Sequence, residues 1–309
     1  MLKYFIITVD TEGDNLWCYK PGHRIYTRNT HFIPRFQNLC NKYRFKPVYL
    51  TNYEMALSDP FVEYAKSWLD EDSCEIGVHL HAWNNPPEYK LTGSGENNPY
   101  LIEYPENIMR LKFETIYSLI TERFGIKPLS HRAGRWAMND IYFKILQEFG
   151  IKIDCSFTPG IDWSNNIGVT RGGANYTTVS RYPSFVDGIF EIPMTIRTIR
   201  HVYEGSLKHR LRTMLKGDKV WMRPATSSDN LMNRLIDVVD KENKVDYIEF
   251  MIHSSELMPN GSPYTPNAES VDRLFEYMES VFSHALAKEL QGVTLKEYFT
   301  IHNPEIRID

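Results

Sequence analysis

Two acidic residues stand close together at the end of the first apolar run of the chain. Residues 4–10 read Tyr-Phe-Ile-Ile-Thr-Val-Asp, and Glu12 and Gly13 follow shortly after Asp10. Side chains alternate along a strand, so Asp10 and Glu12 share one face if the strand geometry continues. Two carboxylates that face one site repel each other unless a cation or a proton lies between them. The pair indicates metal binding or general-base chemistry, with a solvated strand end as the alternative.

Two histidines occupy a second apolar run. Residues 75–83 read Glu-Ile-Gly-Val-His-Leu-His-Ala-Trp, and a Pro-rich segment follows. His79 and His81 again share one face, at a spacing that lets both imidazoles reach one ion. With one carboxylate from the first run they would form a His–His–carboxylate set, which leaves positions open for water and substrate.

Three later runs also end in polar residues. Arg132 and Arg135 flank a glycine, and because arginine cannot act as a base at neutral pH, they would orient a carboxylate or bind substrate oxygens. Asp154 ends another run, and His253 ends the apolar run 250–252. A histidine there can donate a proton to a leaving group near pH 7. For Arg132 and Arg135 the alternative is that both are surface arginines at the rim of a strand. For His253 the alternative is that the histidine only caps the end of a strand.

Short apolar runs that alternate with helical patterns must position these residues. We expect strands at residues 4–10, 47–52, 75–81, 129–136, 151–156, 189–195 and 247–254, with helices at 107–124 and 268–290. Strand–helix alternation predicts a parallel sheet. Seven strands suit a barrel slightly smaller than the eight-stranded type, with its active site at the carboxyl ends of the strands. An open doubly wound sheet is the competing architecture.

Composition and length set the class of protein. The 309 residues are 42% hydrophobic and 24% charged with a formal net charge of −4, so the chain lacks the basic footprint of a nucleic-acid binder. The length allows one or two domains, but without a clear linker or repeat we expect a single domain over 1–309. Segments 84–98 and 158–186 read as long functional loops.

The first residues and the cysteines bear on location. The start lacks the long apolar region of a secretory signal, and no run approaches the roughly 18 apolar residues of a membrane helix. We therefore expect a cytoplasmic protein without a transmembrane segment. The four cysteines lie far apart, which fits reduced structural thiols.

Five segments, taken in order, resemble the motifs of the polysaccharide deacetylase superfamily, the NodB-homology group of carbohydrate esterase family four. These segments span most of the chain and are residues 9–13, 75–81, 131–136, 154–156 and 252–254. The resemblance implies a distorted (β/α)7 barrel. It also implies a divalent-metal hydrolase that removes acetyl groups from N-acetylated sugars.

The resemblance assigns roles to individual residues. By position in the motifs, Asp10 would be the catalytic base, Glu12 a metal ligand and His79 the first metal histidine. Arg132 would orient the base, and His253 would be the general acid. Asp154 would then belong to the shell that supports the site.

The motifs depart from the family pattern in three places. One residue separates Asp10 from Glu12 where the family usually has adjacent aspartates, although some branches share the spacing found here. Trp83 stands where the family has its second metal histidine, which leaves His81 as the near candidate. The third motif lacks its usual prolines.

The leading hypothesis is that Glu12, His79 and His81 hold a divalent ion, Zn²⁺ first with Co²⁺ or Ni²⁺ as alternatives, and that Asp10 activates a water for attack on an amide carbonyl. The substrate would be an N-acetylated sugar, with a cytoplasmic nucleotide-linked or lipid-phosphate-linked precursor as the preferred form. A cyclic amide or imide hydrolase on the same fold, and a non-catalytic carbohydrate-binding relative, are the alternatives.

Aromatic and basic side chains are the candidate substrate contacts. The residues proposed to bind substrate are Trp83, Arg135, Trp136, Asp154 and Arg223, and Trp163 and Trp221 are further candidates for stacking on sugar rings. Buried aromatic packing explains tryptophans equally well. Residues 197–223 hold eight Lys or Arg, a patch that would attract phosphate unless it is only a solvated helix face.

Overall fold

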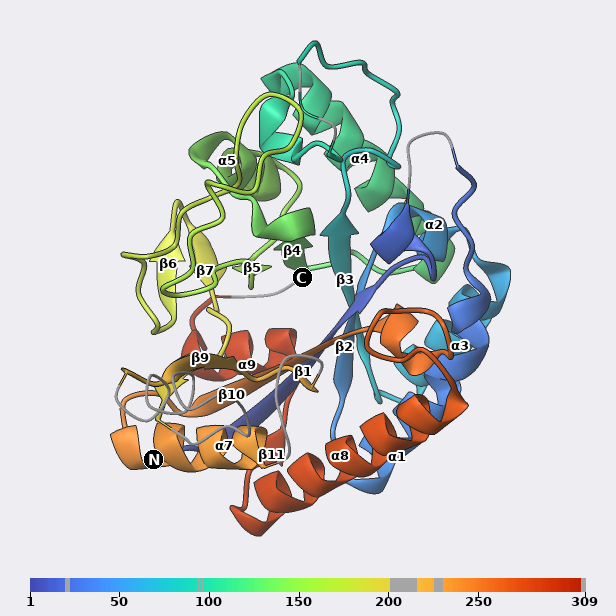
Figure 1. Ribbon diagram of the computed structural model, residues 1–309. Helices are drawn as coiled ribbons and strands as arrows, with labels where there is room; N and C mark the ends of the chain where they lie inside the picture. The colour runs from blue at the N-terminus through green and yellow to red at the C-terminus, as the bar shows by residue number, and fades with distance from the viewer. Residues whose placement is uncertain (20–22, 94, 96, 201–215, 225–229, 307–309) are drawn as a thin grey trace.

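Seven parallel strands form the centre of the protein. The computed structural model describes residues 1–19, 23–93, 95, 97–200, 216–224 and 230–306. Its main sheet has the order β10-β1-β2-β3-β4-β5-β7-β6, with β11 beside β1, and β6 is antiparallel to β7 (Figure 1). The strands are β1 (Tyr4–Thr11), β2 (Pro47–Thr51), β3 (Glu75–Leu80), β4 (Ser130–Ala133), β5 (Ile153–Asp154), β6 (Ser184–Val186), β7 (Ile189–Glu191), β10 (Tyr247–His253) and β11 (Gln291–Gly292).

The sheet curls until its two sides meet. Beyond β7, the Thr195 hydroxyl accepts a hydrogen bond from the Glu249 N–H of β10 (2.9 Å). The Met222 N–H donates to the Thr195 carbonyl, and the Met251 N–H donates to the Met222 carbonyl. These bonds link the β7 side to β10 without a continuous ladder. The prediction of a distorted (β/α)7 barrel is confirmed, and the open doubly wound sheet is wrong.

Helices lie between most of the parallel strands. They are α1 (Ile33–Lys42), α2 (Tyr53–Ala56), α3 (Asp59–Asp70), α4 (Glu106–Phe124), α5 (Asp140–Glu148), α7 (Leu231–Glu242), α8 (Ala268–Ala287) and α9 (Leu295–His302). Short 3-10 turns are η1 (Leu16–Cys18), η2 (Arg28–Phe32), η3 (Leu101–Glu103), η4 (Gly134–Trp136) and η6 (Ser254–Leu257). Local signals set their ends: Gly125 terminates α4 at φ 73°, and the Asn267 side chain caps the first turn of α8. None of the described helices has the length and apolarity to cross a membrane.

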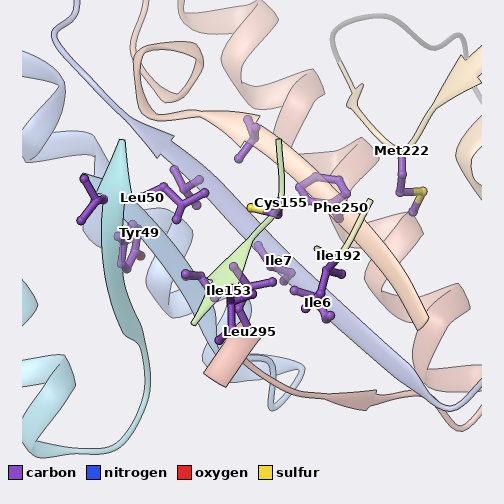
Figure 2. Packing of buried hydrophobic residues seen from close by; sticks show 14 of the residues in the cluster. Ile6, Ile7, Tyr49, Leu50, Ile153, Cys155, Ile192, Met222, Phe250 and Leu295 are labelled. Carbon is purple, nitrogen blue, oxygen red and sulfur yellow. The ribbon is translucent and has the colours of Figure 1, made fainter. Parts of the chain in front are cut away.

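The core fills the inside of the curl and the space beneath the helices. Seven of the eight residues of β1 are buried, which is the near-continuous burial of a strand covered on both faces. Figure 2 shows side chains of β1, β2, β5 and β10 packing with Leu295 of α9 and with Ile192 and Met222, which follow β7 and β9 (Asp218–Trp221). Polar atoms that enter this interior therefore need partners inside the protein.

Two expectations about the chain differ from the structure. The segment predicted as one loop at 158–186 ends in β6, a short strand that is largely exposed and so lacks an apolar run. A separate two-stranded ribbon, β8 (Ile196–Ile199) with β9, was not predicted, because each strand has only four residues. Much of the predicted basic patch, 201–215, lies outside the described residues.

Gly77 lets β3 approach β4 closely. A Cβ atom there would lie 2.4 Å from the Ser130 hydroxyl and 2.7 Å from Leu50 Cδ2. We expect Gly77→Ala to lower the free energy of unfolding by about 1–3 kcal/mol in urea titrations, because the added methyl overfills the core. Ser130→Ala should cost less in the Gly77→Ala protein than in wild type, because it removes the crowded hydroxyl, while its bond to Glu75 is lost in both backgrounds. Lys66→Ala, on the exposed face of α3, is the control, and an equal loss there would contradict the packing argument.

Candidate metal centre and active site

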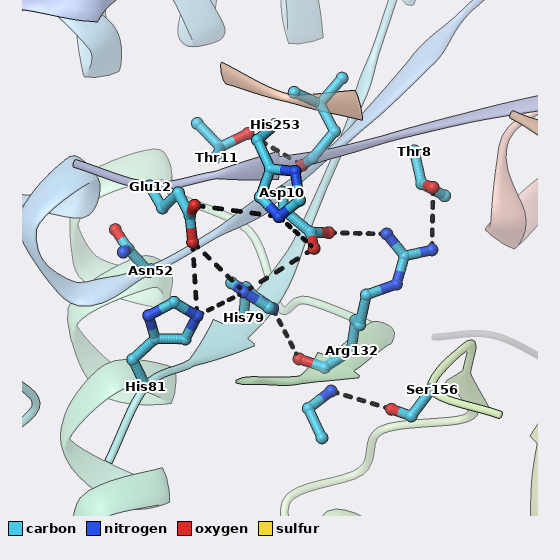
Figure 3. A network of polar contacts seen from close by, with 12 residues as sticks. Thr8, Asp10, Thr11, Glu12, Asn52, His79, His81, Arg132, Ser156 and His253 are labelled. Atoms are coloured by element: carbon cyan, nitrogen blue, oxygen red, sulfur yellow. Dashed lines mark hydrogen bonds and ion pairs between the residues drawn. The ribbon is translucent and has the colours of Figure 1, made fainter. Parts of the chain in front are cut away.

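The carboxyl ends of β1, β3 and β10 bring five polar side chains to one cavity. Strand register places Asp10 of β1 beside His253 of β10, and His79 lies one residue before the end of β3 at Leu80, paired with Arg132 of β4. Asp10, Glu12, His79, His81 and His253 point toward one another (Figure 3). All five line a cavity of about 350 Å³. The structure thus brings together the predicted metal ligands, base and acid.

Three donor atoms in this cavity could hold one metal ion. The Nε2 atoms of His79 and His81 are 2.9 Å apart, and Glu12 Oε2 lies 3.3 Å from His81 Nε2 and 3.8 Å from His79 Nε2. Three points at these separations lie on a circle of radius about 2.0 Å, which matches the bond lengths of Zn²⁺ to nitrogen and oxygen. The three donors fit a divalent ion and leave further positions open.

The two imidazoles are held in the neutral form that a metal requires. His79 Nδ1 lies 2.9 Å from the Arg132 carbonyl and donates its hydrogen there, which leaves the Nε2 lone pair facing the cavity. Burial lowers the pKa of His79 to about 4 and the pKa of His81 well below its ordinary value. His81 Nδ1 has no partner among the described residues, so packing against Trp83, at 4.4 Å between ring centroids, orients that ring.

Glu12 is a buried carboxyl with too little positive charge around it. Burial and the neighbouring carboxyls of Asp10 and Glu54 raise its pKa well above the ordinary value, and Arg223 offsets them only in part. A cation between Glu12 and the histidines would supply the missing charge. The electrostatics of the site therefore agree with its geometry.

Asp10 has the opposite environment. Burial alone would raise its pKa, but Arg132, followed by His79 and His253, outweighs burial and holds the pKa well below the ordinary value. Arg132 Nη1 donates to Asp10 Oδ1 at 2.6 Å. Asp10 Oδ2 faces the cavity, 3.9 Å from His79 Nε2 and 3.8 Å from His253 Nε2. One carboxylate oxygen is thus anchored by Arg132, and the other faces the cavity.

Arg132 is fully buried and does not line the cavity. Besides Asp10, its guanidinium donates to the Thr8 hydroxyl (2.8 Å) and to the Glu249 carboxylate. The Glu249 side chain extends from β10 into the same interior and was not predicted, although a single acid in the apolar run 247–252 is a signal for it. Arg132 therefore reaches the cavity only through its bond to Asp10.

His253 is oriented from behind by an acid that was also missed. Its Nδ1 lies 3.0 Å from Glu256 Oε1 and 3.0 Å from Arg223 Nη2. Because the carboxylate can only accept, we assign the Nδ1 hydrogen to the Glu256 bond, and Nε2 faces Asp10 and Glu12. Arg223 donates to the same Glu256 oxygen at 2.8 Å. The arrangement leaves His253 Nε2 as the atom that can exchange a proton with a ligand in the cavity.

Aromatic and arginine side chains form the cavity walls. Four of the five predicted substrate contacts line it, namely Trp83, Arg135, Trp136 and Arg223. Trp17, Tyr100 and Trp163 join them, and of these only Trp163 was a sequence candidate. Asp154 is fully buried away from the cavity, where it accepts bonds from His131 and Ser156. Its assignment as a substrate contact is wrong, because no surface of its side chain is accessible.

A strained turn carries two of these walls. Arg135 and Trp136 both have left-handed backbone conformations, with φ of 55° and 62°. Non-glycine residues pay roughly 1–2 kcal/mol each for this conformation. The preceding residue, Gly134, has no room for a Cβ, which would lie 2.4 Å from His81 Cδ2 and from the Leu80 carbonyl oxygen. The turn after β4 therefore packs directly against the second histidine.

A larger cavity, of about 560 Å³, lies near the start of β3 and α9. Its charged groups neutralise one another: Lys46 pairs with Asp72 and Glu297, and Glu75 accepts the backbone N–H of Lys296. This cavity lacks the convergence of donor atoms found at the carboxyl ends of the strands.

Neither a known protein family nor a curated protein matches the sequence, whereas solved structures match the fold. The 4-alpha-glucanotransferase of Thermococcus litoralis aligns with 97% of this chain at a TM-score of 0.56 and 10% identity, and the chain spans 40% of that enzyme. A GH57 branching enzyme of Thermococcus kodakaraensis aligns with 100% of the chain, over 72% of its own length, at a TM-score of 0.53 and 12% identity. A putative polysaccharide deacetylase from Mycobacterium smegmatis aligns with 95% of the chain, over 94% of its own length, at 0.48 and 16%. At such identities the likeness concerns the fold alone.

The donor set predicts a single divalent-metal site. We expect the protein to bind about one Zn²⁺ per chain, and His79→Ala or His81→Ala to weaken binding at least tenfold in calorimetric titrations, because each removes one donor. His284→Gln, a histidine that pairs with Asp237 on the surface, is the matched control. Unchanged affinity in both ligand variants would contradict the site.

The buried Glu249 carboxyl should make the free energy of unfolding depend on pH. Burial raises its pKa to about 7 although Arg132 opposes the shift. In the unfolded chain the pKa of a glutamate is about 4.3. The contribution of Glu249 to the free energy of unfolding is therefore complete below about pH 4 and is lost as the pH rises to about 7. Glu249→Gln removes the titration, so its free energy of unfolding relative to wild type should rise between pH 4.5 and 8. A difference that stays constant with pH in urea titrations would contradict this.

Proposed function

We propose that the protein is a metal-dependent hydrolase that removes the acetyl group from an N-acetylated sugar. The observation that carries the proposal is the pairing of Glu12, His79 and His81 around one point with a separate carboxylate oxygen of Asp10 beside it. A metal site alone would serve binding or structure. Hydrolysis requires in addition a general base, and Asp10 is a second carboxylate that stays ionised beside the metal site.

Glu12, His79 and His81 would hold the ion, with Zn²⁺ first and Co²⁺ or Ni²⁺ as alternatives. When bound, such an ion polarises an amide carbonyl and lowers the pKa of a water molecule. The remaining work falls to the side chains of the chain. Burial around the histidines excludes bulk water from the ligand face, which strengthens every charge interaction inside the cavity.

Asp10 is the proposed base and His253 the proposed acid. Asp10 Oδ2 would accept the proton of the attacking water, while the Arg132 bond to Oδ1 keeps the carboxylate aimed. His253 Nε2 would donate a proton to the amine nitrogen as the amide C–N bond breaks, and Glu256 fixes the ring by accepting from Nδ1. Water adds to the carbonyl carbon, so acetate and a free amino sugar leave.

The cavity walls support a sugar substrate. Indole and phenol rings offer flat apolar faces to a sugar ring, and Trp17, Trp83, Trp136 and Trp163 all line the cavity. Linkage to a nucleotide or lipid phosphate stays a prediction. Arg223 reaches the cavity, whereas Arg197 pairs with Glu242 elsewhere.

The alternatives differ in what they require of the metal site. A cyclic imide hydrolase that works without a tightly held metal would keep its activity after chelation. A non-catalytic carbohydrate-binding protein would bind sugar and release no acetate with any ion. Stoichiometric Zn²⁺ and metal-dependent acetate release would exclude both.

Replacing the proposed base tests the mechanism. We expect Asp10→Asn to lower acetate release from N-acetylated saccharides by about 10³-fold or more with Zn²⁺ still bound, because proton abstraction is lost while the three donors remain. Glu249→Gln is the matched control: it alters the same Arg132 network but does not face the cavity, so activity should stay within about tenfold of wild type. Equal losses in the two variants would contradict the assignment of Asp10.

A further inference from the structure

Arg135 is a cation in the cavity wall with an unusual environment. Its guanidinium carbon lies 3.9 Å from the centre of the Tyr100 ring, and Nη1 donates to the Asn98 carbonyl. Both contacts hold the guanidinium against the wall formed by the segment before η3. The side chain is therefore fixed in place and still borders the cavity.

Within the described part of the chain, Arg135 has no carboxylate within 4.0 Å. The other two arginines near the site differ, since Arg132 pairs with Asp10 and Glu249 and Arg223 pairs with Glu256. Glu103 is the acid that acts on Arg135 at longer range, but its carboxylate accepts bonds from backbone N–H groups, those of Tyr100 and residues 169–171.

A partly buried cation without a carboxylate in contact is costly to keep. Charged groups removed from water are normally paired, and burial lowers the pKa of Arg135, as expected where the charge is poorly compensated. The backbone of Arg135 is also left-handed, a conformation that persists where the surroundings demand it and that is common at ligand-binding sites. Two independent features, charge and strain, thus mark the same residue.

We propose that Arg135 binds an anionic group of the substrate, so that the cavity takes an acidic N-acyl sugar rather than a neutral one. This inference rests on the proposed function and adds the substrate class to it. The anion would be a carboxylate or a phosphate on the sugar, both of which match the planar fork of a guanidinium. Arg135 and the three metal-ligating residues line the same cavity, so one ligand can reach both.

The test is a binding measurement that does not depend on turnover. Zn²⁺-loaded Asp10→Asn protein is titrated by calorimetry with neutral N-acetylglucosamine, with N-acetylmuramic acid, with N-acetylglucosamine 6-phosphate and with inorganic phosphate. We expect at least one acidic sugar to bind about tenfold or more tighter than the neutral sugar, the usual effect of one charge-assisted hydrogen bond. The two acidic probes distinguish a carboxylate from a phosphate.

Variants at Arg135 test whether this residue causes the tighter binding of acidic sugars. Arg135→Gln should reduce the acidic preference to less than about threefold, and Arg135→Lys should keep part of it because the charge remains. Arg273→Gln, an exposed arginine of α8 that pairs with Glu269, is the control. In the protein with Arg135 intact, raising the salt from 10 to 500 mM should shrink the preference, a result that needs no Arg135 variant to fold.

Two results would overturn the inference. One is equal binding of acidic and neutral sugars, and the other is an acidic preference that survives in Arg135→Gln. Inorganic phosphate binding as tightly as the sugar phosphate would also overturn it, because the sugar would then add nothing. Binding of acidic sugars by a protein that releases no acetate would refute the proposed function and leave the role of Arg135 intact.

Discussion

The buried Arg132 guanidinium connects strands from opposite sides of the barrel. It extends from β4 across the interior to Thr8 and Asp10 on β1 and to Glu249 on β10. A charge at this depth is tolerable only with its partners in place, since removing one partner of a buried pair typically costs about 3–5 kcal/mol. The curvature that brings β10 within reach of β4 and the charge balance of the interior therefore depend on each other.

Because of the same guanidinium, the two acids at the end of β1 have opposite pKa shifts. Asp10 receives the positive charge and stays ionised, whereas Glu12, two residues on, lies among other carboxyls and neutral imidazoles. One acid is thus suited to accept a proton and the other to ligate a cation. The difference between the two pKa values comes from the position of Arg132 and would remain if both acids were of the same residue type.

The convergence of polar side chains at the strand ends could be predicted because it follows from short local patterns. The alternation of side chains along a strand puts Asp10 with Glu12, and His79 with His81, on one face. Parallel strands then bring these ends together. The three predicted ligands do converge within 4.8 Å of one another. The turn after β4 packs against the ring of His81, the residue that we propose as the second metal histidine.

Partners that depend on distant packing could not be predicted in the same way. Glu249 and Glu256 belong to segments whose local patterns do not reveal what they face, and Trp17 reaches the cavity from a short turn without periodicity. Asp154 shows the converse error. Asp154 occupies the expected position at the end of a strand, but β5 has only two residues. The Asp154 side chain is covered by His131 and Ser156 and does not reach the cavity.

The central claim is that Glu12, His79 and His81 form a metal centre beside Asp10. The most direct test is anomalous diffraction at the zinc edge from crystals grown with Zn²⁺. The account predicts one strong peak per chain, about 2.0–2.2 Å from Glu12 Oε2 and from both Nε2 atoms. A structure with Zn²⁺ bound elsewhere, or with these three side chains free of metal at saturating Zn²⁺, would contradict it.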